Sequence, residues 1–248
     1  MIDHSTVSLH RNAASATRLE PGPFENGAAR QIASSSRRLF LRGSAALTLA
    51  GASAAMFGGH RVANGAPIAV YGPRKDFESI QTHENDHVAF LVQALGADAR
   101  PQPTFQNLEQ KRIAEFYQLA RVFENTGVGA YIGAAPFIDS MDYLSAALTI
   151  ATVEARHSGF INTYLLDPIT APASDDQSDP SFDTPLTADE VATAVGPFIS
   201  SLNGGPAITY SETPSADNDI AILNFALALE YLEADFYNLN VPRFFGGK

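Results

Sequence analysis

The chain has 248 residues, of which 45% are hydrophobic and 17% are charged. This length and composition suit one sizeable core and exclude a wholly disordered chain or a collagen-like repeat. The absence of cysteine excludes disulfides, thiolate metal sites and a cysteine nucleophile. The net charge of −11 argues against nucleic acid and anionic membrane surfaces as partners.

The first 54 residues differ in charge from the rest of the chain. They carry six Arg and three acidic residues, whereas the remainder carries ten basic and 24 acidic residues. The paired arginines of Arg37–Leu41 precede an apolar run, Ser44–Phe57, which is too short to span a bilayer. Within that run, Ala52–Ala54 has the small-x-small form of a cleavage site.

The N-terminal region over 1–54 resembles a twin-arginine signal peptide. The resemblance implies export of the folded chain to the periplasm or the extracellular space, with no membrane association after signal cleavage. The alternative is an ordinary basic N-terminal helix. We therefore expect a signal region over 1–54, a linker over 55–75 and a folded body over 76–248.

In the body, apolar residues recur at steps of three and four, and no strand-like alternation competes over a comparable length. The pattern predicts four long helices, over about 76–95, 105–134, 140–166 and 217–239. A long connection over 167–216, rich in Pro, Asp, Ser and Gly, precedes the last helix. It contains a short helical candidate over 187–202, with Thr187 as its N-cap. The fold class predicted is all-α, a four-helix bundle.

The inward-facing stripe of each predicted helix carries one glutamate where a bundle normally has an apolar residue. Two of the stripes also carry a histidine three residues later. The six residues are Glu84, His87, Glu124, Glu154, His157 and Glu230. A buried carboxylate costs several kcal/mol unless it is paired or bound to metal, and no Lys or Arg occurs in the four stripes.

Two divalent cations would balance four carboxylates accompanied by two neutral imidazoles. This ligand chemistry favours Fe or Mn over Mg or Ca. Di-iron and di-manganese bundles have a characteristic ligand set. Two of their helices contribute one Glu each, and the other two contribute a Glu-x-x-His pair each. The sequence therefore predicts a dimetal site made of the six residues. The alternative is that some of the glutamates lie on solvated faces because the helical register differs by one residue.

Tyr131 and Tyr237 each follow a stripe glutamate, Glu124 or Glu230, by seven residues, which is two helical turns. A phenol in that position could hydrogen-bond a ligating carboxylate. The alternative is that both tyrosines only fill the core. Glycines 127 and 129 of the same helix weaken it and admit either close packing or a bulge.

A competing motif overlaps the first predicted helix, because His83–His87 also matches the H-E-x-x-H pattern of zinc proteases. In that interpretation His83 and His87 bind zinc and Glu84 is the general base. It lacks a third ligand and leaves the other stripe glutamates unexplained.

The sequence resembles the ferritin-like superfamily and, within it, the desiccation-related, stress-associated group of exported proteins. The segments that carry the resemblance are 83–87, 123–131, 153–157 and 222–237. The resemblance implies a four-helix ferritin-like fold with a dimetal centre. The family's first helix, with its lone Glu, stands last here, which implies a circular permutation.

The permuted order needs a connection that runs along the bundle. The proline-containing linker 97–104 would span about 25 Å at ~3.1 Å per residue, close to the length of a 20-residue helix. The alternative is that the last helix docks in a neighbouring molecule, which would make a swapped homo-oligomer.

The function expected is that of an exported dimetal oxidoreductase or ferroxidase-like protein. It would bind two Fe ions, or alternatively two Mn ions, and react with O₂ or peroxide. A manganese-catalase-like activity shares the same ligands. The non-enzymatic alternative is a stress- or desiccation-protective, metal-sequestering protein.

Overall fold

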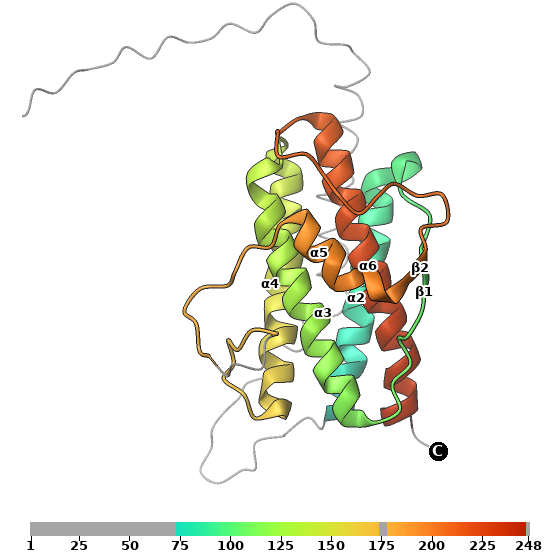
Figure 1. Ribbon diagram of the computed structural model, residues 1–248, viewed down its shortest axis with the longest axis vertical. Coiled ribbons are helices and arrows are strands. Elements are labelled where there is room, and N and C mark those ends of the chain that lie inside the picture. The colour runs from blue at the N-terminus through green and yellow to red at the C-terminus, as the bar shows by residue number, and fades with distance from the viewer. Residues whose placement is uncertain (1–72, 174–177, 247–248) are drawn as a thin grey trace, which may run out of the picture. The chain divides into compact units, whose positions relative to one another are not determined.

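The computed structural model describes residues 73–173 and 178–246. The predicted signal region and residues 55–72 of the predicted linker lie outside them. The described residues form a bundle of four long helices, which confirms the predicted all-α fold (Figure 1). The long helices are α2 (Pro73–Leu95), α3 (Ile113–Ala134), α4 (Met141–Leu165) and α6 (Ala216–Phe245). None of the helices described is long and apolar enough to cross a membrane.

Shorter elements connect the long helices. A short helix, α5 (Ala188–Val195), packs against α3. Two short strands, β1 (Thr104–Phe105) and β2 (Ile199–Ser201), pair antiparallel, with Thr104 opposite Ser201 and Phe105 opposite Ile199. Single 3-10 turns lie at η1 (Gly96–Asp98), η2 (Ala135–Phe137) and η3 (Gly196–Phe198).

Helices α2 and α3 run parallel (Figure 1). The connection over 96–112, which joins the end of α2 to the start of α3, therefore runs back along the length of the bundle. Helices α4 and α6 run in the opposite direction. Helix α2 packs along α6, and α3 packs along α4. The last helix therefore completes the bundle of its own chain.

Three predicted helix boundaries are wrong. One is the end of the last helix, which is predicted at about 239, whereas α6 continues to Phe245. The second long helix begins at Ile113 and not near 105, because residues 104–105 pair with β2 and the backbone N–H of Arg112 bonds the Glu115 carboxylate at 3.1 Å, which marks the start of a helical turn. The short helix predicted over 187–202 ends at Val195, because Gly196 and Pro197 open a 3-10 turn that leads into β2.

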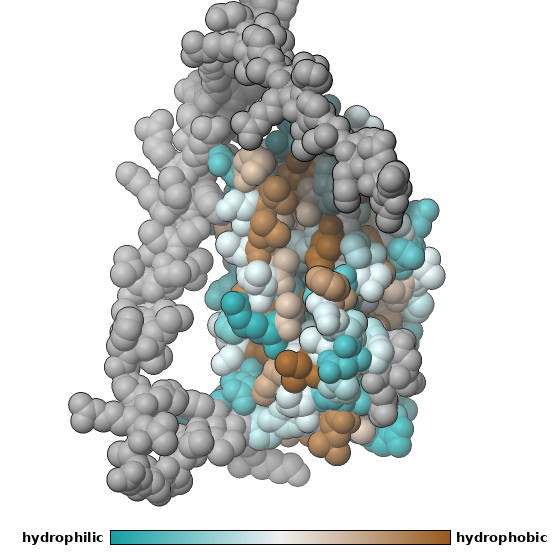
Figure 2. Space-filling view, turned by 90° about the vertical axis from the view of Figure 1, so that its left-hand side faces the viewer, coloured by the Kyte–Doolittle hydropathy of each residue, from teal (hydrophilic) through white to brown (hydrophobic). Residues whose placement is uncertain are grey.

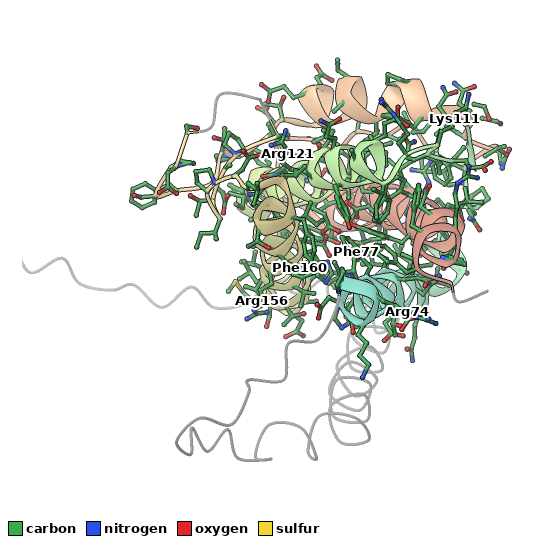
Figure 3. The ribbon with its side chains drawn as sticks, turned by 90° about the horizontal axis from the view of Figure 1, so that it is seen from below. Arg74, Phe77, Lys111, Arg121, Arg156 and Phe160 are labelled. Atoms are coloured by element: carbon green, nitrogen blue, oxygen red, sulfur yellow. The ribbon has the colours of Figure 1, made fainter. Side chains whose placement is uncertain are left out.

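The two halves of the bundle core differ in the size of their side chains. At the end where α2 and α3 begin, Phe77 packs against Phe116 and Phe160 with ring centroids 5.0 and 5.3 Å apart. Figure 3, which looks along the bundle from this end, shows Phe77 and Phe160 side by side. At the other end the core consists mostly of alanine and branched aliphatic residues, among them Leu91, Ala147 and Ala226.

Two glycines of α3 allow the long connection to lie directly on the helix. The Leu186 backbone N–H donates to the Gly129 carbonyl at 2.9 Å, and a Cβ at position 133 would lie 1.9 Å from the Leu186 carbonyl oxygen. The sequence left two alternatives for the glycines of this helix, close packing or a bulge. At Gly129 the structure shows close packing. The connection therefore lies against α3 at Gly129 and Gly133.

Figure 2 shows the side of the molecule on which α4 lies in Figure 1. Hydrophobic residues occur there in two columns in the upper half, among hydrophilic ones. Met141 and Leu148 of α4 are 72% and 51% exposed. Exposed apolar side chains in this number are ordinary on a protein surface.

Candidate metal centre

The structure brings all six predicted ligands together at mid-height of the bundle. Helix α2 contributes Glu84 and His87, and α4 contributes Glu154 and His157, because a spacing of three residues puts both members of each pair on one face. Helices α3 and α6 contribute one glutamate each, Glu124 and Glu230. All four glutamates are fully buried. The helical register that would put some of them on a solvated face is not the one adopted.

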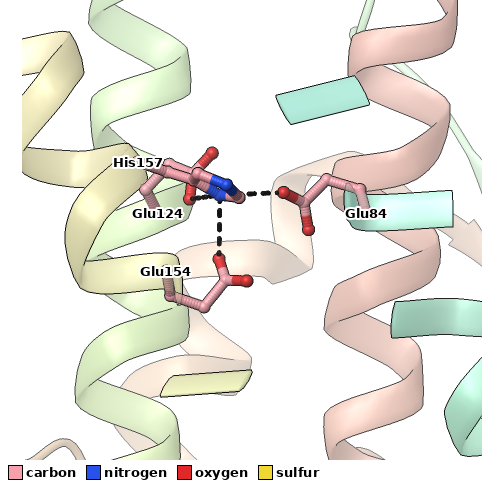
Figure 4. Close-up of side chains that lie close together, drawn as sticks. All are labelled: Glu84, Glu124, Glu154 and His157. Atoms are coloured by element: carbon pink, nitrogen blue, oxygen red, sulfur yellow. Dashed lines mark hydrogen bonds and ion pairs between the residues drawn. The ribbon is translucent and has the colours of Figure 1, made fainter. Parts of the chain in front are cut away.

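The ligand atoms form two groups, and each could hold a metal ion. One group consists of Glu84, Glu124, Glu154 and His157, drawn in Figure 4, and the other of Glu84, His87, Glu154 and Glu230. Within each group the ligand atoms all lie within 4.8 Å of one another. Glu84 and Glu154 belong to both groups.

The two shared carboxylates each direct one oxygen to each half of the site. Glu84 Oε1 lies 3.0 Å from His157 Nδ1, and its Oε2 lies 3.3 Å from His87 Nδ1. Glu154 Oε1 lies 3.0 Å from His87 Nδ1, and its Oε2 lies 4.0 Å from His157 Nδ1. Each of the two shared carboxylates could therefore offer a ligand atom to both halves of the site.

The other two carboxylates serve one half each. Glu124 Oε2 lies 3.2 Å from His157 Nδ1, and Glu230 Oε2 lies 3.2 Å from His87 Nδ1. Each half of the site therefore has one imidazole, one carboxylate of its own and the two shared ones.

Without a metal ion, the shared carboxylates carry an electrostatic penalty. Burial and then the neighbouring Glu154 raise the pKa of Glu84 to about 7. Burial and then Glu124 and Glu230 raise the pKa of Glu154 to about 8. Burial alone would lower the pKa of His87 and His157, but the surrounding carboxylates raise both.

The buried acceptors fit a bound cation. Glu84 Oε1 and both oxygens of Glu154 are buried without a hydrogen bond of normal geometry. Such orphaned carboxylate oxygens are costly unless a cation occupies the space between them. Carboxylate and imidazole together are the donor set of Fe and Mn sites.

Each tyrosine singled out in the sequence bonds a ligand on the opposite helix. Tyr131 Oη on α3 donates to Glu230 Oε1 on α6 at 2.5 Å, and Tyr237 Oη on α6 donates to Glu124 Oε1 on α3. Burial and then the carboxylate beside each phenol raise the pKa of both tyrosines. Both hydroxyls are therefore protonated donors that fix the carboxylates of the separate halves.

His83 lies next to the site but outside both ligand groups. Its Nδ1 lies 2.9 Å from His157 Nε2, the ring nitrogen that faces away from the shared carboxylates. Among the described residues, neither group that could hold a metal includes His83. The H-E-x-x-H interpretation therefore lacks His83, one of its two histidine ligands, and Glu84, its general base, lies among the carboxylates.

A further acidic residue, Glu233, was not identified from the sequence. Its side chain is 2% exposed, its Oε2 has no hydrogen-bond partner, and burial and then Glu154 raise its pKa well above the ordinary value. A Cβ at Gly127 would lie 3.3 Å from Glu233 Oε1, which is a tight contact, and 3.7 Å from Glu154 Oε2, which is an ordinary one, so the missing side chain at 127 makes room for the Glu233 carboxylate. The signal was the three-residue spacing from Glu230, which places Glu233 on the same helical face.

Comparison with known proteins gives one family. The model of the ferritin-like domain matches residues 61–167 and 218–245. These two segments contain all six ligand candidates and leave out the connection between α4 and α6. No curated protein and no solved structure matches the chain.

Proposed function

This chain belongs to the ferritin-like domain family, and from that premise we propose that it is a dimetal-carboxylate protein that uses two Fe ions, or two Mn ions, in chemistry with O₂ or peroxide. The observation that carries the proposal is the position of Glu84 and Glu154, which belong to both four-residue groups. Four carboxylates balance the charge of two divalent ions.

Each residue of the site would have a particular role in holding the two ions. Glu84 and Glu154 would hold both ions, with Glu124 and His157 completing one position and Glu230 and His87 the other. When bound, two redox-active ions supply two electrons together. The phenols of Tyr131 and Tyr237 fix their carboxylates, as outer partners of metal ligands commonly do. The aromatic half of the core keeps water from one side of the site.

The helix order supports a circular permutation of the family's bundle. The helix with the lone Glu and the Asn224–Leu227 run is the last in the chain, yet it packs along α2, and a full-length crossover joins the parallel helices α2 and α3. Export through the twin-arginine route and a role in desiccation or other stress belong to the same proposal, on the strength of the sequence resemblance.

Metal analysis tests the proposal. The full chain, purified without chelators, should hold about two Fe or Mn ions, and the variant Glu154→Ala/His157→Ala should lose them. Oxidation of the loaded protein by O₂ or peroxide should then be measurable. Metal binding without turnover would favour a sequestering or protective protein, and the absence of Fe and Mn from a folded wild-type chain would overturn the dimetal proposal.

A further inference from the structure

An exposed histidine of α2, His83, contacts the metal centre from outside the two ligand groups. Its Nδ1 lies 2.9 Å from Nε2 of His157 on α4. The planes of the two rings differ by 6°, and the ring centroids lie 5.2 Å apart. Because the two nitrogens are much closer to each other than the two ring centres are, the rings meet edge to edge. The bond therefore lies along the plane of both rings, where the lone pair of an imidazole nitrogen points.

The second ring nitrogen of His157 determines which residue donates this bond. Nδ1 of His157 lies 3.0 Å from Glu84 and 3.2 Å from Glu124, so it is the atom that would bind an ion in that half of the site (Figure 4). A nitrogen that binds a metal carries no proton, and a neutral imidazole then has its proton on the other nitrogen, here Nε2. Two N–H donors cannot bond each other, so His83 Nδ1 is the acceptor.

The other histidine ligand, His87, lacks a partner of this kind. Among the described residues, its hydrogen-bond and ion-pair partners are the carboxylates of Glu84, Glu154 and Glu230, and it reaches all three through Nδ1. Its Nε2 therefore has no side chain that corresponds to His83. The two metal positions are alike in their ligands, but they differ in what holds the imidazole.

We propose that His83 is a positioning residue that makes the position formed by Glu124 and His157 the tighter of the two metal positions. By accepting the bond from Nε2–H, it fixes the tautomer and the ring orientation of His157, so that Nδ1 is unprotonated and directed at the ion. Outer hydrogen-bond partners of ligating histidines change metal affinity by about 10–100-fold. The inference rests on the proposed function, because it requires a metal ion at the site, and it adds which position is filled first.

Two substitutions separate the hydrogen bond from the mere presence of a side chain. His83→Leu removes the acceptor, whereas His83→Asn keeps one, because the side-chain oxygen of Asn takes the place of Nδ1. Thr82→Leu is the matched control, since Thr82 is also exposed on α2 and its hydroxyl bonds a backbone carbonyl of its own helix. Thermal unfolding of the metal-free variants confirms that each one folds.

Titration with Co²⁺ against a chelator measures the two positions one at a time. Glu230→Gln leaves the position with His157, and Glu124→Gln leaves the other one. Co²⁺ should bind more tightly to Glu230→Gln than to Glu124→Gln. Adding His83→Leu to Glu230→Gln should weaken binding at least tenfold, and adding His83→Asn should recover most of the loss. Neither change should affect Glu124→Gln by more than Thr82→Leu does.

The Nε2 proton gives a second readout, which a change of packing alone would not move. In the Co²⁺-loaded protein, the ring N–H of a ligating histidine gives a strongly shifted proton NMR signal that is absent in D₂O. The His157 signal should persist in the wild type and in His83→Asn, and it should be lost to exchange with water in His83→Leu.

The possible failures are distinguishable. Equal Co²⁺ affinities in His83→Leu and Thr82→Leu, or tighter binding in Glu124→Gln than in Glu230→Gln, would overturn the role of His83 and leave the dimetal proposal standing. A folded wild-type chain that binds no Co²⁺, Fe or Mn would overturn the proposed function and this inference together.

Discussion

Tyr131 on α3 donates a 2.5 Å hydrogen bond to Glu230 on α6, and Tyr237 on α6 returns a bond to Glu124 on α3. Because α3 and α6 run in opposite directions, each phenol reaches the glutamate that lies two turns from the other phenol. The two bonds join the helices around the metal centre. They also fix the two carboxylates that belong to only one half of the site.

Removing one of these phenols should weaken one metal position. Tyr131→Phe leaves the ring in place but takes the donor from Glu230, so the affinity of the half with Glu230 and His87 should fall by about 10–100-fold. Competition with a metal chelator measures it. Tyr164→Phe, in the aromatic half, is the control. Equal affinities in the two variants would mean that Tyr131 only fills the core.

The stability of the metal-free protein should fall as the pH rises from 5 to 8. The raised pKa values of Glu84, about 7, and Glu154, about 8, mean that the folded state binds more protons than the unfolded state in this range. The stabilising effect of the protonated carboxyls is complete below about pH 4.5 and is lost as the pH passes through the folded values. The raised pKa values of His87 and His157 act in the same direction.

Metal binding should reverse this dependence, because the ligands must be deprotonated. The difference in Tm between loaded and metal-free protein should therefore widen from pH 5 to pH 8 in scanning calorimetry. In Glu84→Gln/Glu154→Gln the metal-free Tm should vary less with pH. A metal-free wild type that becomes more stable as the pH rises would contradict the electrostatic description of the site.

Substitution of a shared carboxylate and substitution of an unshared one should lower the number of bound metal ions by different amounts. Glu154→Gln removes the negative charge that both groups share and replaces one carboxylate oxygen with an amide nitrogen, so it should reduce occupancy at both positions. Glu230→Gln should mainly empty one position. Metal content after gel filtration, followed by titration with Fe²⁺ under nitrogen, separates the two results. Loss of the same number of ions from both variants would argue against two carboxylates shared by both ions.

The six candidate ligands could be found from sequence because helical periodicity fixes which residues share a face. Glu84 and His87, or Glu154 and His157, face the core together in any helix that has Ile80 or Ile150 inside. The start of α3 could not be found, because Phe105 continues the apolar pattern but pairs with β2 instead. Glu233 was missed because a second acidic residue on the same stripe departs from the known ligand pattern. The crosswise bonding of the tyrosines depends on the antiparallel packing of two helices, and the bonded residues lie 99 and 113 residues apart in the chain.

The last prediction concerns the contact between the long connection and α3. A Cβ at position 133 would lie 1.9 Å from the Leu186 carbonyl oxygen and 3.1 Å from its backbone nitrogen, and this neighbour is backbone that cannot rotate away. Gly133→Ala should therefore destabilise the protein by about 1–3 kcal/mol, as overpacking does, despite the helix propensity of alanine. Gly196→Ala is the matched control, because a Cβ there meets nothing within 4 Å and the backbone is helical. It should be neutral or stabilising by up to about 1 kcal/mol. Urea unfolding of both variants measures the difference, and equal midpoints would show that residues 184–186 do not lie on α3 in solution.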